Sequence, residues 1–126
     1  MSGKISKVLI VDDAMFIRRR LKKIVETIDS TKVVGEATNG EEAISLYKDL
    51  KPDLVCMDLV MPEKDGLKAI EEIIKFDKKA KIVVVSAMGQ QSSVLEALGK
   101  GAKEFIQKPF RDDDVYTKIE RLLKKK

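Results

Sequence analysis

The stretch "VLIVDDAMFIRRRL", residues 8–21, decides the fold and raises the first question about the site. Four apolar residues end at two adjacent carboxylates, Asp12 and Asp13, and a helical pattern of apolar residues follows directly. A single Asp is enough to cap a helix, and two neighbouring negative charges repel each other. The second carboxylate therefore needs an explanation of its own.

The same succession of a short apolar run and a helical pattern recurs along the chain. Apolar runs predict strands at 7–11, 32–37, 53–58, 81–87 and 104–107. Apolar residues at helical spacing predict helices at 14–28, 39–50, 66–76, 92–100 and 112–123. Strands that are apolar throughout are typical of a parallel sheet covered on both faces. We therefore predict a single α/β domain over residues 1–126, without an output domain, in which five helices cover both faces of a five-stranded parallel sheet.

The composition narrows the class of protein. A chain of 126 residues, of which 44% are hydrophobic, is long enough to bury one core. No apolar run approaches the length of a membrane span, and the polar start "MSGKISK" shows no signal-peptide pattern. The single cysteine, Cys56, excludes an internal disulfide; we expect a core residue, with a redox sensor as the alternative. These features favour a cytoplasmic protein that does not engage membranes.

Charge and the absence of histidine exclude further classes. Much of the positive charge behind the net +4 lies in the basic runs at 18–23 and 121–126. Such runs form the solvated faces of helices or, alternatively, a docking patch for an acidic partner or nucleic acid. Aromatic residues are scarce and do not alternate with the basic ones, so we expect no nucleic-acid partner. Because the chain has no histidine, Ser-His-Asp catalysis, Cys-His catalysis and histidine zinc sites are excluded.

Chemically capable side chains stand at the ends of four of the five predicted strands. In chain order they are Asp12 and Asp13, Asp58, Ser86, and Lys108. Taken alone, an Asp there is usually a helix cap, a Ser a turn residue and a Lys a surface ion-pair partner. In open parallel sheets, however, ligands bind beyond the carboxyl ends of the strands. Five such groups at one edge predict a shared site.

Three carboxylates without a histidine form a site for a hard cation, and Mg²⁺ fits best. Asp13 is expected to approach the cation directly and Asp12 through water. Asp58 then serves as a nucleophile toward a phosphoryl group, forming an acyl phosphate. Lys108 and Ser86 are expected to contact the phosphoryl oxygens.

Two related chemistries fit this pattern less well. A flavodoxin-type FMN site needs Ser, Thr and Gly after the first strand, whereas this chain has two anions there. A haloacid-dehalogenase-type phosphatase carries Asp-x-Asp at that place, whereas here the two Asp residues are adjacent and residue 14 is Ala.

Four motifs resemble the receiver domain of two-component response regulators. They are "VLIVDD" (8–13), "DLVCMDLVMPEKDG" (53–66), "VVVSAMGQQ" (83–91) and "GAKEFIQKPF" (101–110). The resemblance runs from about residue 7 to residue 123 and is greatest for stand-alone chemotaxis regulators of the CheY type. It implies a flavodoxin-like sheet with strand order 2-1-3-4-5, the order for which CheY is a standard example.

The resemblance also assigns roles around the acidic residues. Asp58 is implied to be the phosphoacceptor of a histidine kinase, which acts in trans because this chain has no histidine. Mg²⁺ is implied to bind Asp12, Asp13, Asp58 and the backbone carbonyl of Val60.

Further roles implied by the resemblance concern the fourth and fifth strands. Ser86 is implied to follow the phosphoryl group inward, and Phe105 to change its burial as part of the same switch. Lys108 is implied to be joined to Pro109 by a cis peptide bond.

The partners implied by the resemblance are proteins. They are a histidine kinase of the CheA type and a flagellar or archaellar motor switch or adaptor protein. A separate phosphatase is expected because Val60 and Met88 cannot hydrogen-bond a water that attacks the acyl phosphate. The chain is then expected to be a monomer. It is not expected to be an enzyme, because its only reactions are to accept a phosphoryl group on itself and to lose that group slowly. The alternatives are a phosphorelay intermediate not linked to motility, a phosphatase for small substrates, and a module that binds its partner constitutively.

Overall fold

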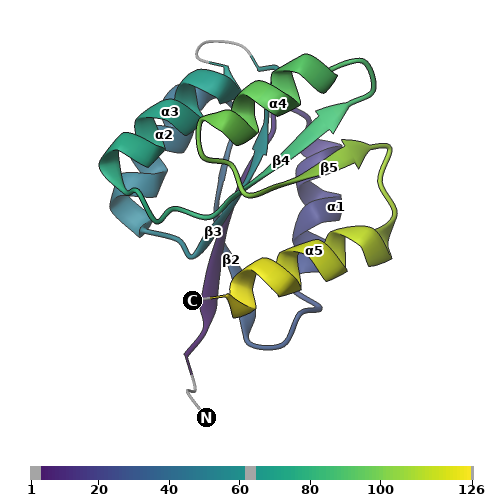
Figure 1. Cartoon of the computed structure of the whole chain (residues 1–126). Helices are drawn as coiled ribbons and strands as arrows, with labels where there is room; N and C mark the ends of the chain where they lie inside the picture. Colours follow the sequence, from purple (N-terminus) through teal and green to yellow (C-terminus); the bar gives the residue numbers. More distant parts are fainter. Residues whose placement is uncertain (1–3, 62–64, 126) are drawn as a thin grey trace.

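The computed structural model describes residues 4–61 and 65–125, in which strands and helices alternate strictly. The strands are β1 (Ser6–Val11), β2 (Thr31–Ala37), β3 (Leu54–Asp58), β4 (Ile82–Ala87) and β5 (Glu104–Lys108). The helices are α1 (Met15–Val25), α2 (Gly40–Leu50), α3 (Gly66–Phe76), α4 (Gln91–Gly99) and α5 (Asp112–Lys124). All paired strands are parallel, in the order β2-β1-β3-β4-β5 (Figure 1), so the predicted topology is confirmed.

Two separate cores hold the helices against the sheet. Successive side chains of a strand point to opposite faces, so Val8 and Ile10 of β1 pack with α1 and α5. Leu9 and Val11 of the same strand pack on the other face with α2, α3 and α4. Every residue of β3 is buried, as expected for a central strand covered on both sides. The prediction of helices on both faces is therefore confirmed.

Cys56 belongs to the core on the α1 and α5 side of the sheet. It is completely buried, and burial raises the pKa of its thiol to about 12. A thiol that stays protonated is a poor nucleophile. The structure therefore supports the core-packing interpretation over the redox sensor.

One predicted boundary is wrong, at the end of the first helix. The helix was expected to reach residue 28, but α1 ends at Val25, and 3₁₀-type hydrogen bonds follow it. The Thr27 hydroxyl and amide both donate to the carbonyl of Ile24, at 2.6 and 3.1 Å, which competes with continued helix. Ile28 is still buried, so the apolar spacing predicted burial correctly and hydrogen bonding incorrectly. All other predicted boundaries lie within one residue of the observed ones.

In the described part of the chain, no helix has both the length and the apolar composition that a membrane crossing requires.

Gly66, the first residue of α3, fixes how closely this helix approaches the end of β3. A Cβ atom built there would lie 2.2 Å from the backbone oxygen of Asp58 and 2.7 Å from the Cα of Leu59. The Gly66 amide also donates to the Leu59 carbonyl at 3.1 Å. The position tolerates only glycine without a backbone shift at the residue that ends β3.

We predict that Gly66→Ala lowers the free energy of unfolding by about 1–3 kcal/mol, because the added methyl group overlaps backbone atoms that cannot rotate away. Gly99→Ala is the matched control, since a Cβ there meets nothing within 4 Å and its φ is not positive. The control should be neutral or stabilising by roughly 0.5–1 kcal/mol. Urea denaturation of both variants measures the difference, and equal stabilities would contradict the packing argument.

Candidate functional site

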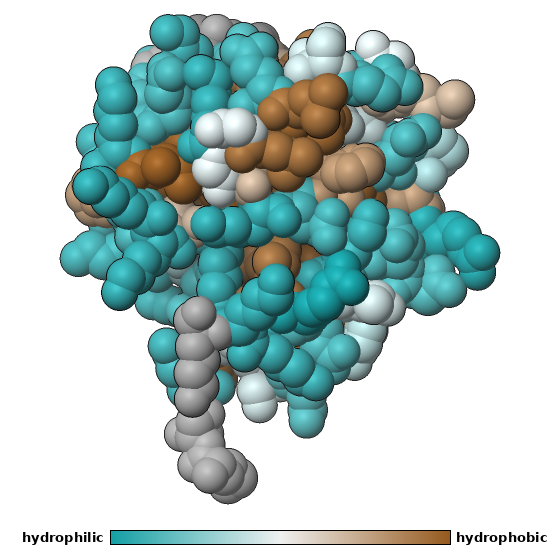
Figure 2. Space-filling view, viewed as in Figure 1, coloured by the Kyte–Doolittle hydropathy of each residue, from teal (hydrophilic) through white to brown (hydrophobic). Residues whose placement is uncertain are grey.

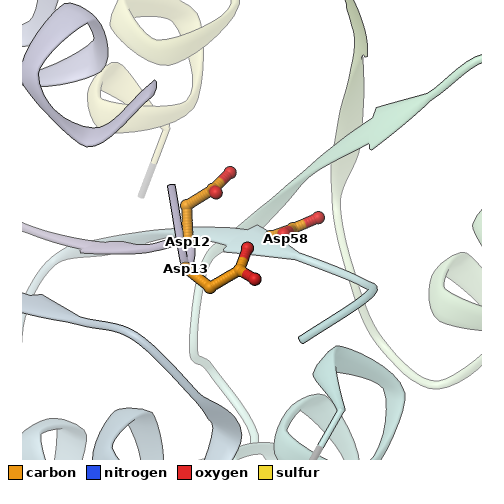
Figure 3. Close-up of side chains that lie close together, drawn as sticks. All are labelled: Asp12, Asp13 and Asp58. Atoms are coloured by element: carbon orange, nitrogen blue, oxygen red, sulfur yellow. The ribbon is translucent and has the colours of Figure 1, made fainter. Parts of the chain in front are cut away.

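Three carboxylates meet at the carboxyl ends of β1 and β3. Asp12 and Asp13 directly follow β1, and Asp58 is the last residue of β3, the strand that pairs with β1. Figure 3 shows the three side chains together, and each offers an oxygen that lies within 4.8 Å of the other two. Asp12 and Asp58 are buried, with 1% and 5% of their surfaces exposed, whereas Asp13 is exposed. The predicted convergence of these residues is therefore present in the fold.

Hydrogen bonds fix Asp12 on both of its carboxylate oxygens. The Ala14 amide donates to Oδ1 at 2.9 Å, and the Lys108 ammonium donates to Oδ2 at 2.9 Å. Asp13, in contrast, accepts no hydrogen bond from the described residues, and it does not cap α1. The N-cap residue of α1 is Ala14, whose side chain makes no capping hydrogen bond. The explanation of Asp13 as a helix cap is therefore wrong.

Lys108 is the only cation that an ion pair joins to these carboxylates within the described residues. It ends β5, and its peptide bond to Pro109 is cis. Its Nζ lies 2.9 Å from Asp12 and 3.7 Å from Asp58. One ammonium thus faces two buried carboxylates, with a third, Asp13, beside them.

The crowding disfavours the ionised form of Asp58. Burial, and after it the Asp12 charge, raise the pKa of its carboxyl to about 6 against the opposing effect of Lys108. The folded protein therefore binds this proton more tightly than the unfolded chain does. By linkage, the contribution of Asp58 to the free energy of unfolding falls as pH rises from about 4 to about 6. At neutral pH the ionised Asp58 is an unfavourable charge that a cation would relieve.

Ser86 and Phe105 lie beside one cavity. Ser86 is buried in β4, one residue beyond Val85, which pairs with Asp58. Phe105 is 37% exposed, on β5. Both line a mainly apolar cavity of about 230 Å³ between β4, β5 and α4.

Val60 is mostly exposed, and its backbone amide lies 3.4 Å from Asp58 Oδ1. The role of its carbonyl as a metal ligand stays a prediction, as do the roles assigned to the other site residues.

Sequence reasoning missed one residue that contacts this group. The Arg18 guanidinium donates to the backbone carbonyl of Asp12 at 2.8 Å and to the Glu36 carboxylate at 2.9 Å. Nothing in the run "RRR" distinguishes Arg18 from its two neighbours, because the distinction depends on which arginine faces β2.

The chemistry of the donor set fits a divalent cation. Three carboxylates offer hard oxygen ligands, and no histidine or accessible thiolate competes for a softer metal. The exposed position of Asp13 leaves one side of the group open to solvent. Asp13 and Asp58 are the direct ligands that this arrangement favours, because protein donors already occupy both oxygens of Asp12.

Comparisons with known proteins agree with this geometry. The response regulator receiver domain family matches residues 8–120. The chemotaxis protein CheY of Thermotoga maritima is 54% identical over 118 residues, which cover 94% of this chain and 98% of that protein. CheY of Listeria monocytogenes is 51% identical over the same shares of the two chains.

A solved structure extends the likeness to the whole fold. The CheX–CheY–BeF3–Mg²⁺ complex from Borrelia burgdorferi contains a chain with a TM-score of 0.91 and 35% sequence identity. The similarity covers 98% of this chain and 93% of that one. The family match covers most of the chain, and the curated relatives are about half identical to it over nearly its whole length. The chain therefore belongs to the response regulator receiver domain family and is a CheY-like chemotaxis member of it.

Proposed function

We propose that this receiver domain is switched by phosphorylation of Asp58 and that the donor is a histidine kinase of the CheA type. The observation that carries the proposal is the gathering of Asp12, Asp13 and Asp58, two of which, Asp12 and Asp58, share the ammonium of Lys108. In the proposed step, an Asp58 oxygen attacks the phosphorus of a phosphohistidine in the kinase. The phosphorus–nitrogen bond breaks, the imidazole leaves with its electron pair, and an acyl phosphate forms on Asp58.

The surrounding residues have distinct roles in this proposal. Asp13, Asp58 and the Val60 carbonyl hold Mg²⁺, with Asp12 contributing through water. When bound, Mg²⁺ supplies neutralisation of the negative charge on the phosphoryl oxygens. Lys108 already lies within 3.7 Å of Asp58 and is placed to exchange its contact with Asp12 for one with a phosphoryl oxygen.

The output of the switch is proposed to be docking on a motor switch or adaptor protein. Apolar surface gathers over α4 in Figure 2, where Leu95 is 69% exposed. Leu95 and Phe105 both line the cavity that reaches Ser86. A phosphoryl group that draws Ser86 inward would thus change the shape of a surface formed by α4 and β5. This supports the surface around α4, β5 and α5 as the docking face.

We further propose that the chain is not an enzyme that turns over substrates. Val60 and Met88, from the loops after β3 and β4, are 62% and 70% exposed, and neither side chain can activate a water. The phosphorylated form should therefore be long-lived and depend on a separate phosphatase. The protein is proposed to act as a cytoplasmic monomer.

Incubation with acetyl phosphate tests the proposed function. Intact mass spectrometry should show a phosphoryl adduct that requires Mg²⁺, because the repulsion between Asp58 and the incoming phosphoryl group must be neutralised. Asp58→Asn removes the nucleophile and should abolish the adduct, whereas Asp53→Asn, at the opposite end of β3, should keep it. A folded protein that binds Mg²⁺ but forms no adduct would contradict the proposal and favour a constitutive binding module.

The lifetime of the phosphorylated form tests the roles of Val60 and Met88. The double variant Val60→Asn, Met88→Glu should lose its phosphoryl group roughly tenfold faster, because polar side chains can orient the attacking water. Ile5→Asn is a control, since Ile5 is also an exposed apolar residue, 54% exposed, and lies before β1. Equal lifetimes of the double variant and the wild-type protein would rule out this explanation.

A further inference from the structure

We propose that Arg18 is a positioning residue that holds the Asp12–Asp13 turn in the geometry that a divalent cation needs. The inference rests on the Mg²⁺ binding proposed above. Arg18 lies one turn into α1, and only 13% of its side chain is exposed. It is therefore a partly buried cation behind the acidic group, and not part of the solvated basic face of its helix.

The guanidinium of Arg18 joins three elements at one point. Its Nη1 donates to the Asp12 carbonyl at 2.8 Å, and its Nε donates to Glu36 of β2 at 2.9 Å. A planar guanidinium with two partners has a fixed orientation, which a single ammonium contact would not impose. The end of β1, the start of α1 and the edge strand β2 are thereby tied together.

The atom that Arg18 contacts decides where Asp13 points. The Asp12 carbonyl belongs to the peptide unit between Asp12 and Asp13, and this unit is planar. The Asp13 Cα lies in the same plane. Fixing the carbonyl oxygen therefore restricts the orientation of the backbone that carries the Asp13 side chain. Asp13 itself accepts no hydrogen bond from the described residues, so the direction of its carboxylate depends on this backbone. The N-cap residue Ala14 supplies no side-chain cap, and its amide donates to the Asp12 carboxylate, so Asp12 is held on its side chain and, through Arg18, on its carbonyl.

A purely electrostatic role for Arg18 predicts the opposite effect on Mg²⁺ binding. A cation near a metal site repels the metal, so its removal should strengthen binding. A positioning role predicts that removal weakens binding, because partners of the residues around a metal typically contribute 10-fold to 100-fold in affinity. The sign of the change therefore distinguishes the two roles.

The chain contains a matched control for charge. Arg19 is the next residue of α1, is exposed, and makes no contact with the acidic group among the described residues. Arg18→Gln and Arg19→Gln remove the same charge from adjacent positions on the same helix. Only Arg18→Gln also removes the hydrogen bond to the Asp12 carbonyl.

Calorimetric titration with Mg²⁺ tests the proposal on the purified wild-type protein and both variants. We expect Arg18→Gln to bind Mg²⁺ about tenfold more weakly and Arg19→Gln to bind it as tightly as the wild type or more tightly. At saturating Mg²⁺, phosphorylation of Arg18→Gln by acetyl phosphate should return to the wild-type rate. Arg18→Gln binding as tightly as Arg19→Gln would overturn the proposal.

A second variant keeps the test decisive if Arg18→Gln is poorly folded. Arg18→Lys keeps the positive charge and removes the planar fork that donates to both Asp12 and Glu36, so it should also weaken Mg²⁺ binding. Urea denaturation without Mg²⁺ shows whether the variants remain folded. A wild-type protein that binds no Mg²⁺ would overturn the proposed function itself, whereas unchanged binding by Arg18→Lys and Arg18→Gln would overturn only the role of Arg18.

Discussion

Three carboxylates and one ammonium share the carboxyl edge of the sheet, and their charges do not balance. The parallel sheet creates the problem, because β1 and β3 are neighbours and each ends in acidic residues at the same edge. Lys108 reaches this group from β5, which is three strands away from β1 in the sheet. With all groups ionised, three negative charges meet one positive charge, which leaves a net charge of −2.

The remaining charge is what gives the site its chemistry. Two of the carboxylates are buried, and one of them, Asp58, has a pKa of about 6 because of that burial and of its neighbour Asp12. A divalent cation would offset the charge and turn an unfavourable cluster into a phosphoryl-acceptor site. Two residues outside the cluster support the backbone that carries it. Gly66 allows α3 to approach the end of β3, and Arg18 donates a hydrogen bond to the turn after β1.

The fold was predictable because its signals are local and consistent. Apolar runs and helical spacing fixed nearly every boundary, and Asn39 caps α2 through the amide of Glu42 as its sequence pattern predicts. The acidic site followed from the rule that strand ends share an edge. The contact of Arg18 with the Asp12 carbonyl did not, because it depends on how α1 rotates against β2. The early end of α1 was missed for a similar reason, since burial continues there after the helix stops.

The most direct test of this account is the titration of the Asp58 carboxyl, followed by NMR on protein labelled with carbon-13 in aspartate. Without Mg²⁺ the pKa should lie near 6, because burial and Asp12 disfavour the ionised form. With saturating Mg²⁺ the pKa should fall well below that value, because the cation favours the ionised form. Asp58→Asn assigns the resonance. An Asp58 pKa near 3.8 that Mg²⁺ leaves unchanged would contradict the claim that crowded, uncompensated carboxylates define this site.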